Sequence, residues 1–146
     1  MAQDSTADEA SIREHIEALA RAIRGKDIDG AMATFAPDVV SFDLGPPLAH
    51  GGGDVFRSHW RALFAAYRDG IEFDVRDLAI ALSGDVAFSH GLNRMAGITA
   101  DGRRSERWLR WTACWRRREG RWLVVHEHVS VPVDPREGRA LMDLRP

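Results

Sequence analysis

At 146 residues, with 45% hydrophobic and 29% charged side chains, the chain has the composition of one globular domain that buries a core. A net charge of −2 gives no overall attraction to nucleic acid, and no apolar run reaches the length of a membrane span. Cys114 is the only cysteine, which excludes an internal disulfide, and the polar N-terminus lacks the apolar stretch of a signal peptide. These features predict a cytoplasmic protein with no nucleic-acid or membrane partner.

Two helices are predicted ahead of the first strand. Apolar side chains recur at helical spacing from about residue 8 to 24, and Gly25 ends this pattern. Asp27 is a suitable N-cap for a second, shorter helix. Pro37 is expected to break the chain before a strand that runs from Val39 to Asp43.

A loop rich in glycine and proline is predicted over residues 45–53, and it leads into a third helix over about 54–68. Large apolar residues, among them Trp60, recur on one side of this helix, with His59 beside them. Gly70 is expected to close the helix.

The segment 71–133 predicts four strands joined by tight turns, because apolar and polar residues alternate along it. The alternation changes phase near Arg76 and Asp77, which indicates a bulge that bends the sheet. Helical signals followed by strand signals are typical of an α+β domain. We therefore expect one cone-shaped domain, with a core over about 8–133 and a tail at 134–146. Three N-terminal helices would pack on a strongly curved, mostly antiparallel sheet that encloses a pocket.

The first glycine turn in this segment sets the register of the two strands beside it. Asp101-Gly102 is the favoured pair for a two-residue hairpin. A turn of that length places Arg94 opposite Leu109 and His90 opposite Ala113.

The second turn contains Glu119-Gly120. A two-residue loop would force Glu119 to positive φ at a cost of about 1 kcal/mol, so a three-residue loop is expected. That loop places Trp111 opposite Glu127.

Together the two registers place three ionisable groups, His90, Arg94 and Glu127, on the face that packs against the helices. One interpretation is structural, with an Arg94–Glu127 pair and a hydrogen-bonded core His90. The other is a solvated pocket with aromatic walls, which the bulk of Trp111 between Arg94 and Glu127 favours.

The opposite face of the sheet mixes polar and apolar residues, which predicts a homodimer contact through this outer face. Its expected members are Asn93, Arg110, Thr112, Cys114, Trp122, Val124, His126 and His128. His126 and His128 have a spacing compatible with two metal ligands, but no third ligand is evident beside them. We therefore predict no metal and no cofactor. His50, in the loop, is expected to be solvated.

Three runs carry a resemblance to a known family: KDIDGAMATFAPDVVSFD, GPPLAHGGGDVFRSHW and RWTACWRRREGRWLVVHEHVSVPVD. Over roughly residues 8 to 133 the chain resembles the ketosteroid-isomerase-like, SnoaL-like branch of the nuclear-transport-factor-2-like superfamily. The resemblance implies the cone-shaped fold and leaves the reaction open. This fold hosts isomerases, dehydratases, cyclases, hydrolases and non-enzymatic association modules.

The resemblance implies a general-base role for Asp43, which occupies the position of the ketosteroid isomerase base. The alternative is an Asx turn into the following loop. The oxyanion groups of those isomerases do not carry over, because Leu19 and Ala113 stand at their positions. Steroid isomerisation is therefore not expected.

The closing hairpin is also similar to the association domains of calmodulin-dependent kinases, although Ala113 and Val129 replace the inward arginines that bind carboxylates there. Two functions stay open. The first is an acid–base enzyme of the isomerase, lyase or cyclase type that acts on a small apolar carbonyl-containing molecule. The second is a non-catalytic small-ligand-binding or association domain. In the first, the catalytic residues would be Asp43, His90 and Glu127, and substrate contacts would come from His59, Trp60, Arg94 and Trp111.

Overall fold

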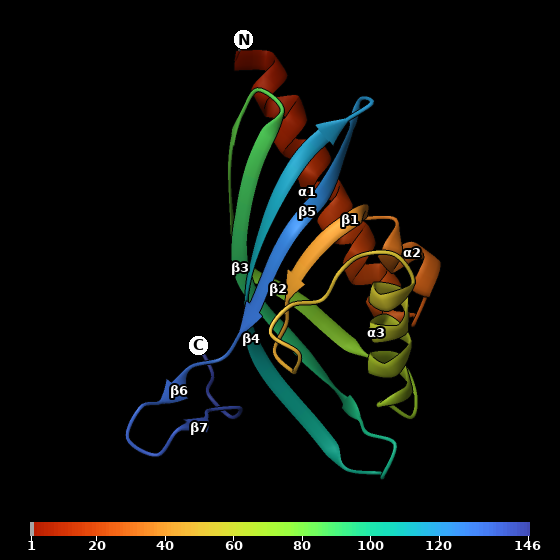
Figure 1. Ribbon diagram of the computed structural model, residues 1–146, viewed down its shortest axis with the longest axis vertical. Helices are drawn as coiled ribbons and strands as arrows, with labels where there is room; N and C mark the ends of the chain where they lie inside the picture. Colours follow the sequence, from red (N-terminus) through yellow and green to blue (C-terminus); the bar gives the residue numbers. More distant parts are fainter. Residues whose placement is uncertain (1) are drawn as a thin grey trace.

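The structure is a computed structural model and describes residues 2–146. Three helices, α1 (Ala2–Arg24), α2 (Ile28–Met32) and α3 (Asp54–Ala65), gather on one side of a curved sheet (Figure 1). The sheet has the order β1-β5-β4-β3-β2; β1 pairs with β5 in parallel and all other pairs are antiparallel. Its strands are β1 (Phe35–Phe42), β2 (Glu72–Ser83), β3 (Val86–Ile98), β4 (Arg104–Arg118) and β5 (Arg121–Ser130). The predicted α+β class is confirmed.

The tail forms a small separate hairpin of β6 (Val133–Asp134) and β7 (Arg139–Ala140), at the lower left of Figure 1. No helix within residues 2–146 is long and apolar enough to cross a membrane.

α1 packs one apolar side against the sheet, with Ile12, Ile16 and Ile23 all buried. It ends before Gly25, as predicted, but it begins several residues earlier than residue 8. Asp8 accepts hydrogen bonds from Arg117 and from the indole of Trp122, at 2.8 and 3.0 Å. These contacts attach the N-terminal half of the helix to the far end of the β4–β5 hairpin.

β1 starts at Phe35, so the expected break at Pro37 ahead of the strand is wrong. β1 is an edge strand, and its pairing with β5 is interrupted between Phe35 and Val40. Proline lacks a backbone N–H, and at this unpaired stretch of an edge the ladder loses no hydrogen bond. Asp43 follows the strand directly.

α3 is shorter than predicted and ends at Ala65, so Gly70 does not close it. Asp27 caps α2 as predicted, its carboxylate accepting a hydrogen bond from the Gly30 N–H. Phe56, Trp60 and Phe64 line the buried side of α3. Tyr67, just beyond it, is buried and pairs with Thr99 through an isolated bridge.

The loop before α3 lies against β1. Ser41 and His50 exchange two backbone hydrogen bonds of 2.9 and 2.8 Å. A Cβ on Gly52 would come within 2.1 Å of the Pro37 carbonyl oxygen, whereas one on Gly51 would meet nothing within 4 Å.

Gly52→Ala is therefore expected to lower the free energy of unfolding by about 2 kcal/mol, because backbone on both sides must shift. The matched control, Gly51→Ala, should change it by less than about 0.5 kcal/mol. Urea denaturation of the two variants checks this. Equal effects would show that the loop does not pack on β1 as described.

The predicted bulge in β2 is confirmed. The pairing with β3 shifts between Arg76 and Ala79, and Asp77 has a φ of 55°. A bulge of this kind increases the local bend of the sheet.

The predicted β3–β4 register is wrong by one residue. The turn has three residues, 100–102, because the Thr99 N–H donates to the Arg103 carbonyl at 2.8 Å and Gly102 takes the left-handed position with a φ of 86°. The Asp101 side chain accepts hydrogen bonds from Thr99 and Arg103 inside this turn. A three-residue turn with a left-handed glycine at its last position thus replaces the two-residue turn.

The slip of one residue exchanges the two faces of β3. Ser89, Gly91, Asn93 and Met95 lie on the inner face in place of His90 and Arg94.

The predicted interior positions of His90 and Arg94 are therefore wrong. His90 is exposed. Arg94 forms ion pairs on the outer face with Asp74 and Glu106, at 3.3 and 3.2 Å.

The β4–β5 turn is shorter than expected, with two residues that both have positive φ: 52° at Glu119 and 77° at Gly120. This turn places Trp122 and Val124 on the inner face at 2% and 0% exposure, although both were predicted outside. Burying two large apolar side chains stabilises the fold by several kcal/mol, which exceeds the cost of about 1 kcal/mol at Glu119.

An extra residue then restores the predicted phase of β5. The register shifts between the pairs Trp115–Val124 and Cys114–His126, which leaves Val125 as a bulge. Glu127 consequently faces inward, as predicted, and lies opposite Ala113 rather than Trp111.

Candidate functional site

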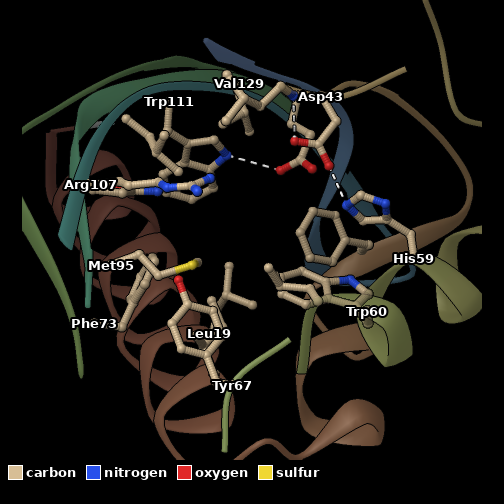
Figure 2. A pocket seen from close by; sticks show the side chains of 18 residues that line it. Leu19, Asp43, His59, Trp60, Tyr67, Phe73, Met95, Arg107, Trp111 and Val129 are labelled. Atoms are coloured by element: carbon tan, nitrogen blue, oxygen red, sulfur yellow. Dashed lines mark hydrogen bonds and ion pairs between the residues drawn. The ribbon is translucent and has the colours of Figure 1, made fainter. Parts of the chain in front are cut away.

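A cavity of about 320 Å³ lies between α1, α3 and the inner face of the sheet (Figure 2). Its walls are mainly apolar and aromatic: Leu19, Ile23, Phe35, Trp60, Leu63, Tyr67, Phe73, Met95, Leu109, Trp111 and Val129. A concave apolar site with a few polar groups at defined places is the usual form of a small-molecule pocket.

Three ionisable side chains from three different elements meet at one end of the cavity. Asp43 follows β1, His59 comes from α3, and Glu127 comes from β5. The parallel pairing of β1 with β5 sets Ser41 beside Glu127 and so brings Asp43 to the same end.

Glu127 is a buried carboxyl group with only 6% of its surface exposed. Its two oxygens accept hydrogen bonds from the Ser41 hydroxyl at 2.9 Å and the Trp111 indole at 3.0 Å. Burial raises the pKa of Glu127 to about 7, and the charge of Asp43 acts in the same direction; the two hydrogen bonds and His59 oppose the shift. Near neutral pH this group therefore exchanges a proton readily.

Asp43 and His59 form a close ion pair between a carboxylate oxygen and Nε2 of the imidazole (Figure 2). Burial favours a higher pKa for Asp43, but the hydrogen bonds from His59 and from the Leu44 N–H, with the charge of His59, bring its pKa below the ordinary value. The hydrogen bond to Asp43 raises the pKa of His59 in turn, against the effect of burial. Asp43 is thus kept ionised, whereas Glu127, close by, is about half protonated near pH 7.

His50 extends this cluster, and the prediction that it is solvated is wrong. It is 9% exposed, and its ring centre lies 4.8 Å from that of His59. Its Nε2 is buried without a hydrogen-bond partner among the described residues. Asp43, His50 and His59 each offer one ligand atom, and these atoms lie within 4.8 Å of one another. A carboxylate with two imidazoles is a donor set that zinc and other transition metals accept.

The cavity also has polar groups away from the cluster. Arg107 on β4 lines it on the side opposite His59 (Figure 2). Asn93 on β3 lies on the same inner face. Neither residue was predicted at the site. Extending the inward alternation of β4 back two residues from Leu109 reaches Arg107, which was the available signal. Asn93 was placed outside by the register error.

Five of the predicted site residues line the cavity, namely Asp43, His59, Trp60, Trp111 and Glu127. His90 and Arg94 do not, because they lie on the outer face of β3. On that face His126 donates a hydrogen bond of 2.7 Å from Nδ1 to the Val40 carbonyl, and the ring of Phe42 packs against it.

Comparison with known proteins agrees with this geometry. The model of the SnoaL-like domain family matches residues 12–134. A solved structure from Pseudomonas putida KT2440, described as an NTF2-like protein of unknown function, is 36% identical with a TM-score of 0.88, and the match covers 97% of this chain and 99% of that chain. No curated protein matches the sequence significantly.

More distant solved structures show the same fold in proteins with different descriptions. One from Streptomyces avermitilis, provisionally assigned as a dehydratase of the NTF2-like family, is 15% identical with a TM-score of 0.77, and the match covers 89% of this chain and 99% of that chain. The association domain of the kinase CaMKII from C. elegans is 17% identical with a TM-score of 0.68, and covers 88% and 98%. At these identities the likeness shows the fold alone.

Proposed function

The chain belongs to the SnoaL-like domain family, and from that premise we propose that its cavity is the active site of an acid–base enzyme. The proposed substrate is a small, largely apolar molecule with a carbonyl group, and the proposed reaction moves a proton on the carbon beside that group. The observation that carries the proposal is the pair of carboxyl groups at one end of the cavity, whose pKa values are shifted in opposite directions.

The opposite directions of the two pKa shifts assign the roles of base and acid. Asp43 is ionised and acts as the base that takes the proton from the carbon. Glu127, with a pKa of about 7, is protonated in about half of the molecules at neutral pH, and in that form it donates a hydrogen bond to the carbonyl oxygen, where negative charge develops. Return of the proton from Asp43 to a different carbon completes an isomerisation, and loss of a leaving group from the enolate would give a lyase.

The remaining polar groups of this end act on the two carboxyls. His59 holds Asp43 in its ionised form and in one orientation through the ion pair. Ser41 and Trp111 hold Glu127 in place from two sides. Aromatic walls exclude water from the reacting end, which strengthens these interactions.

Exchange of protons for deuterium beside a carbonyl tests the proposal without knowledge of the natural substrate. The probes are cyclohex-2-enone, 1-indanone and 2-tetralone in D₂O, followed by proton NMR. We expect exchange above the buffer rate, with a bell-shaped pH profile whose upper limb falls near pH 7, where Glu127 loses its proton. In Glu127→Gln this upper limb should disappear.

A rate that rises steadily through pH 7, or no exchange above buffer with any probe, would contradict the proposal. Dialysis against a chelator and addition of zinc belong in the same experiment, because Asp43, His50 and His59 offer a metal-ligand set. Side-chain acid–base catalysis predicts an unchanged rate after chelation.

A ligand-binding or association module is the second candidate, and the apolar cavity favours it as well as it favours an enzyme. The two differ in one measurement, since a binding module would bind the probes without exchanging their protons.

The predicted homodimer stays a proposal, and its supporting residues change. Trp122 and Val124 lie inside, whereas Val40, Phe42 and Phe88 expose 42%, 39% and 51% of their surfaces on the outer face. These side chains now support the same outer-face contact.

A further inference from the structure

Arg107 is a charged residue of the cavity lining that has no acidic partner among the described residues, whereas three other arginines of β4 each have one. Arg104 pairs with Glu72 at 2.5 Å, Arg117 pairs with Asp8 at 2.8 Å, and Arg118 pairs with Asp38. Within residues 2–146 no hydrogen bond or ion pair reaches Arg107, although its guanidinium lines the cavity (Figure 2). The Arg107 side chain is exposed, so water solvates its charge and the guanidinium is available to an anion that enters the cavity.

The surroundings of Arg107 are apolar on the cavity side. Met95 lies opposite it across the β3–β4 pair, and Leu109 follows it on the same face. Its sequence neighbour Glu106 faces the other way and is already engaged by Arg94 and Arg145, at 3.2 and 3.4 Å. Low polarity on the cavity side strengthens the attraction between the guanidinium and an anion that enters there.

A second polar group is close to Arg107 on the same face. Asn93 pairs with Leu109, so it is the diagonal neighbour of Arg107, at a spacing of about 7–8 Å between such positions. Asn93 is buried, and its side-chain oxygen has no hydrogen-bond partner among the described residues. This oxygen is an acceptor, so Asn93 has capacity left for a hydrogen-bond donor of a ligand, such as a hydroxyl or an N–H group.

From this arrangement we infer that the cavity binds small ring-containing carboxylates, with the carboxylate on Arg107 and the ring between the aromatic walls. The far end of such a molecule then reaches Asp43 and Glu127. The inference rests on the proposed function only for that last placement, which makes the substrate a cyclic or aryl keto acid.

Size and charge agree with this class. A cavity of about 320 Å³ is at the small end of the range of ligand pockets, which suits a molecule with one or two rings. Asp43 and His59 form an ion pair with each other, so neither offsets the positive charge that Arg107 supplies to the cavity wall.

Binding of two probes of the same shape tests the inference: trans-cinnamate, which carries a carboxylate, and cinnamamide, which is neutral. Affinities are measured by NMR titration at pH 6.5. We expect the wild-type protein to bind cinnamate roughly tenfold more tightly than cinnamamide, since a charge-assisted bidentate bond contributes about that factor at a partly exposed site. The chemical shift of the Arg107 Nε–H should change when cinnamate is added and should not change when cinnamamide is added.

Three variants complete the test. Arg107→Gln should remove the preference for cinnamate and leave cinnamamide binding unchanged. Arg107→Lys keeps the positive charge but loses the planar pair of N–H donors that binds a carboxylate at both oxygens. It should retain part of the preference for cinnamate. Arg116→Gln is the matched control, because Arg116 is exposed on the opposite face of the same strand. It should behave as wild type.

Equal affinity for the two probes, no saturable binding of cinnamate at millimolar concentration, or a preference that survives in Arg107→Gln would each overturn the inference. These outcomes are distinct from failure of the proposed function, because they are equilibrium measurements that need no proton exchange. Loss of carboxylate selectivity with a normal exchange profile would remove the inference alone. Carboxylate selectivity without exchange would leave a binding protein for these acids.

Discussion

The free energy of unfolding of the wild-type protein is expected to fall by about 3 kcal/mol as the pH rises from about 4.5 to about 7. In Glu127→Gln this fall should be absent. The folded-state pKa of Glu127 is about 7, against an ordinary value of 4.5, so the folded state keeps a proton that the unfolded chain releases in this window. Stability falls with pH wherever the folded state binds more protons than the unfolded state. A shift of about 2.5 units corresponds to about 3 kcal/mol. Above pH 7 the difference should level off.

Urea denaturation of wild type and variant at pH 5, 6, 7 and 8 measures this effect as the difference between two curves. His59 also has a raised pKa, so its contribution to stability is present at low pH and is lost as the pH rises through that pKa. Both proteins contain His59, and its contribution largely cancels in the difference. Parallel curves would show that Glu127 ionises as an ordinary solvated carboxyl, and the acid role proposed for it would fail with them.

Asp43→Asn is expected to reduce proton exchange at the probe ketones at least about 100-fold, since an amide cannot take the proton and general-base catalysis contributes about that factor or more. Ketone binding should be kept, because asparagine has the same shape. The pKa of His59 should fall in the variant, as its raised value depends first on the hydrogen bond to Asp43. Exchange rates by proton NMR and the titration of His59 by nitrogen-15 NMR measure the two effects.

Asp38→Asn is the matched control for this variant. Asp38 lies on β1, is exposed, and pairs with Arg118 on the surface. It should leave exchange and the His59 titration unchanged. If Asp43→Asn lowers the pKa of His59 while exchange continues at the wild-type rate, the ion pair is structural and another group is the base.

Local chemistry in the sequence was sufficient for much of the fold. The helical spacing and Gly25 predicted where α1 ends, and Asp27 predicted the cap of α2. The change of phase at Arg76 and Asp77 predicted the bulge of β2. Each of these signals depends on residues within a few positions of one another, so the chain alone carries the information.

The two turns show where local chemistry was insufficient. At Asp101-Gly102 the favoured two-residue pair lost to a three-residue turn, in which the Asp101 side chain accepts hydrogen bonds from Thr99 and Arg103. At Glu119-Gly120 the chain forms the two-residue turn that was not expected, with a positive φ at Glu119, because this turn brings Trp122 and Val124 into the core. The second choice depends on contacts with distant parts of the chain, which a turn sequence does not contain. The first depends on side-chain hydrogen bonds within the turn itself, which the two-residue pattern leaves out.

The consequences for the site differ between the two ends of the cavity. Asp43 and Glu127 were predicted at the site and line it, whereas His90 and Arg94 were exchanged for Asn93 and Arg107. Glu127 kept its inward position because the bulge at Val125 compensates the shorter turn. Nothing in the sequence of β5 marks that bulge. The inward position of Glu127 was therefore predicted correctly, but from a turn length that the structure does not have.

The parallel pairing of β1 with β5 has a consequence for how the protein folds. Ser41 and Glu127, which share a hydrogen bond, are 86 positions apart, and Asp43, which follows β1, depends on the same pairing for its place beside Glu127. Closing so long a loop is slow, and its entropic cost is recovered only when the contacts on both sides form. The reactive end should therefore be assembled in one of the last steps of folding, after the β2–β5 meander, and fragments that lack either terminal strand should be inert even if they are compact.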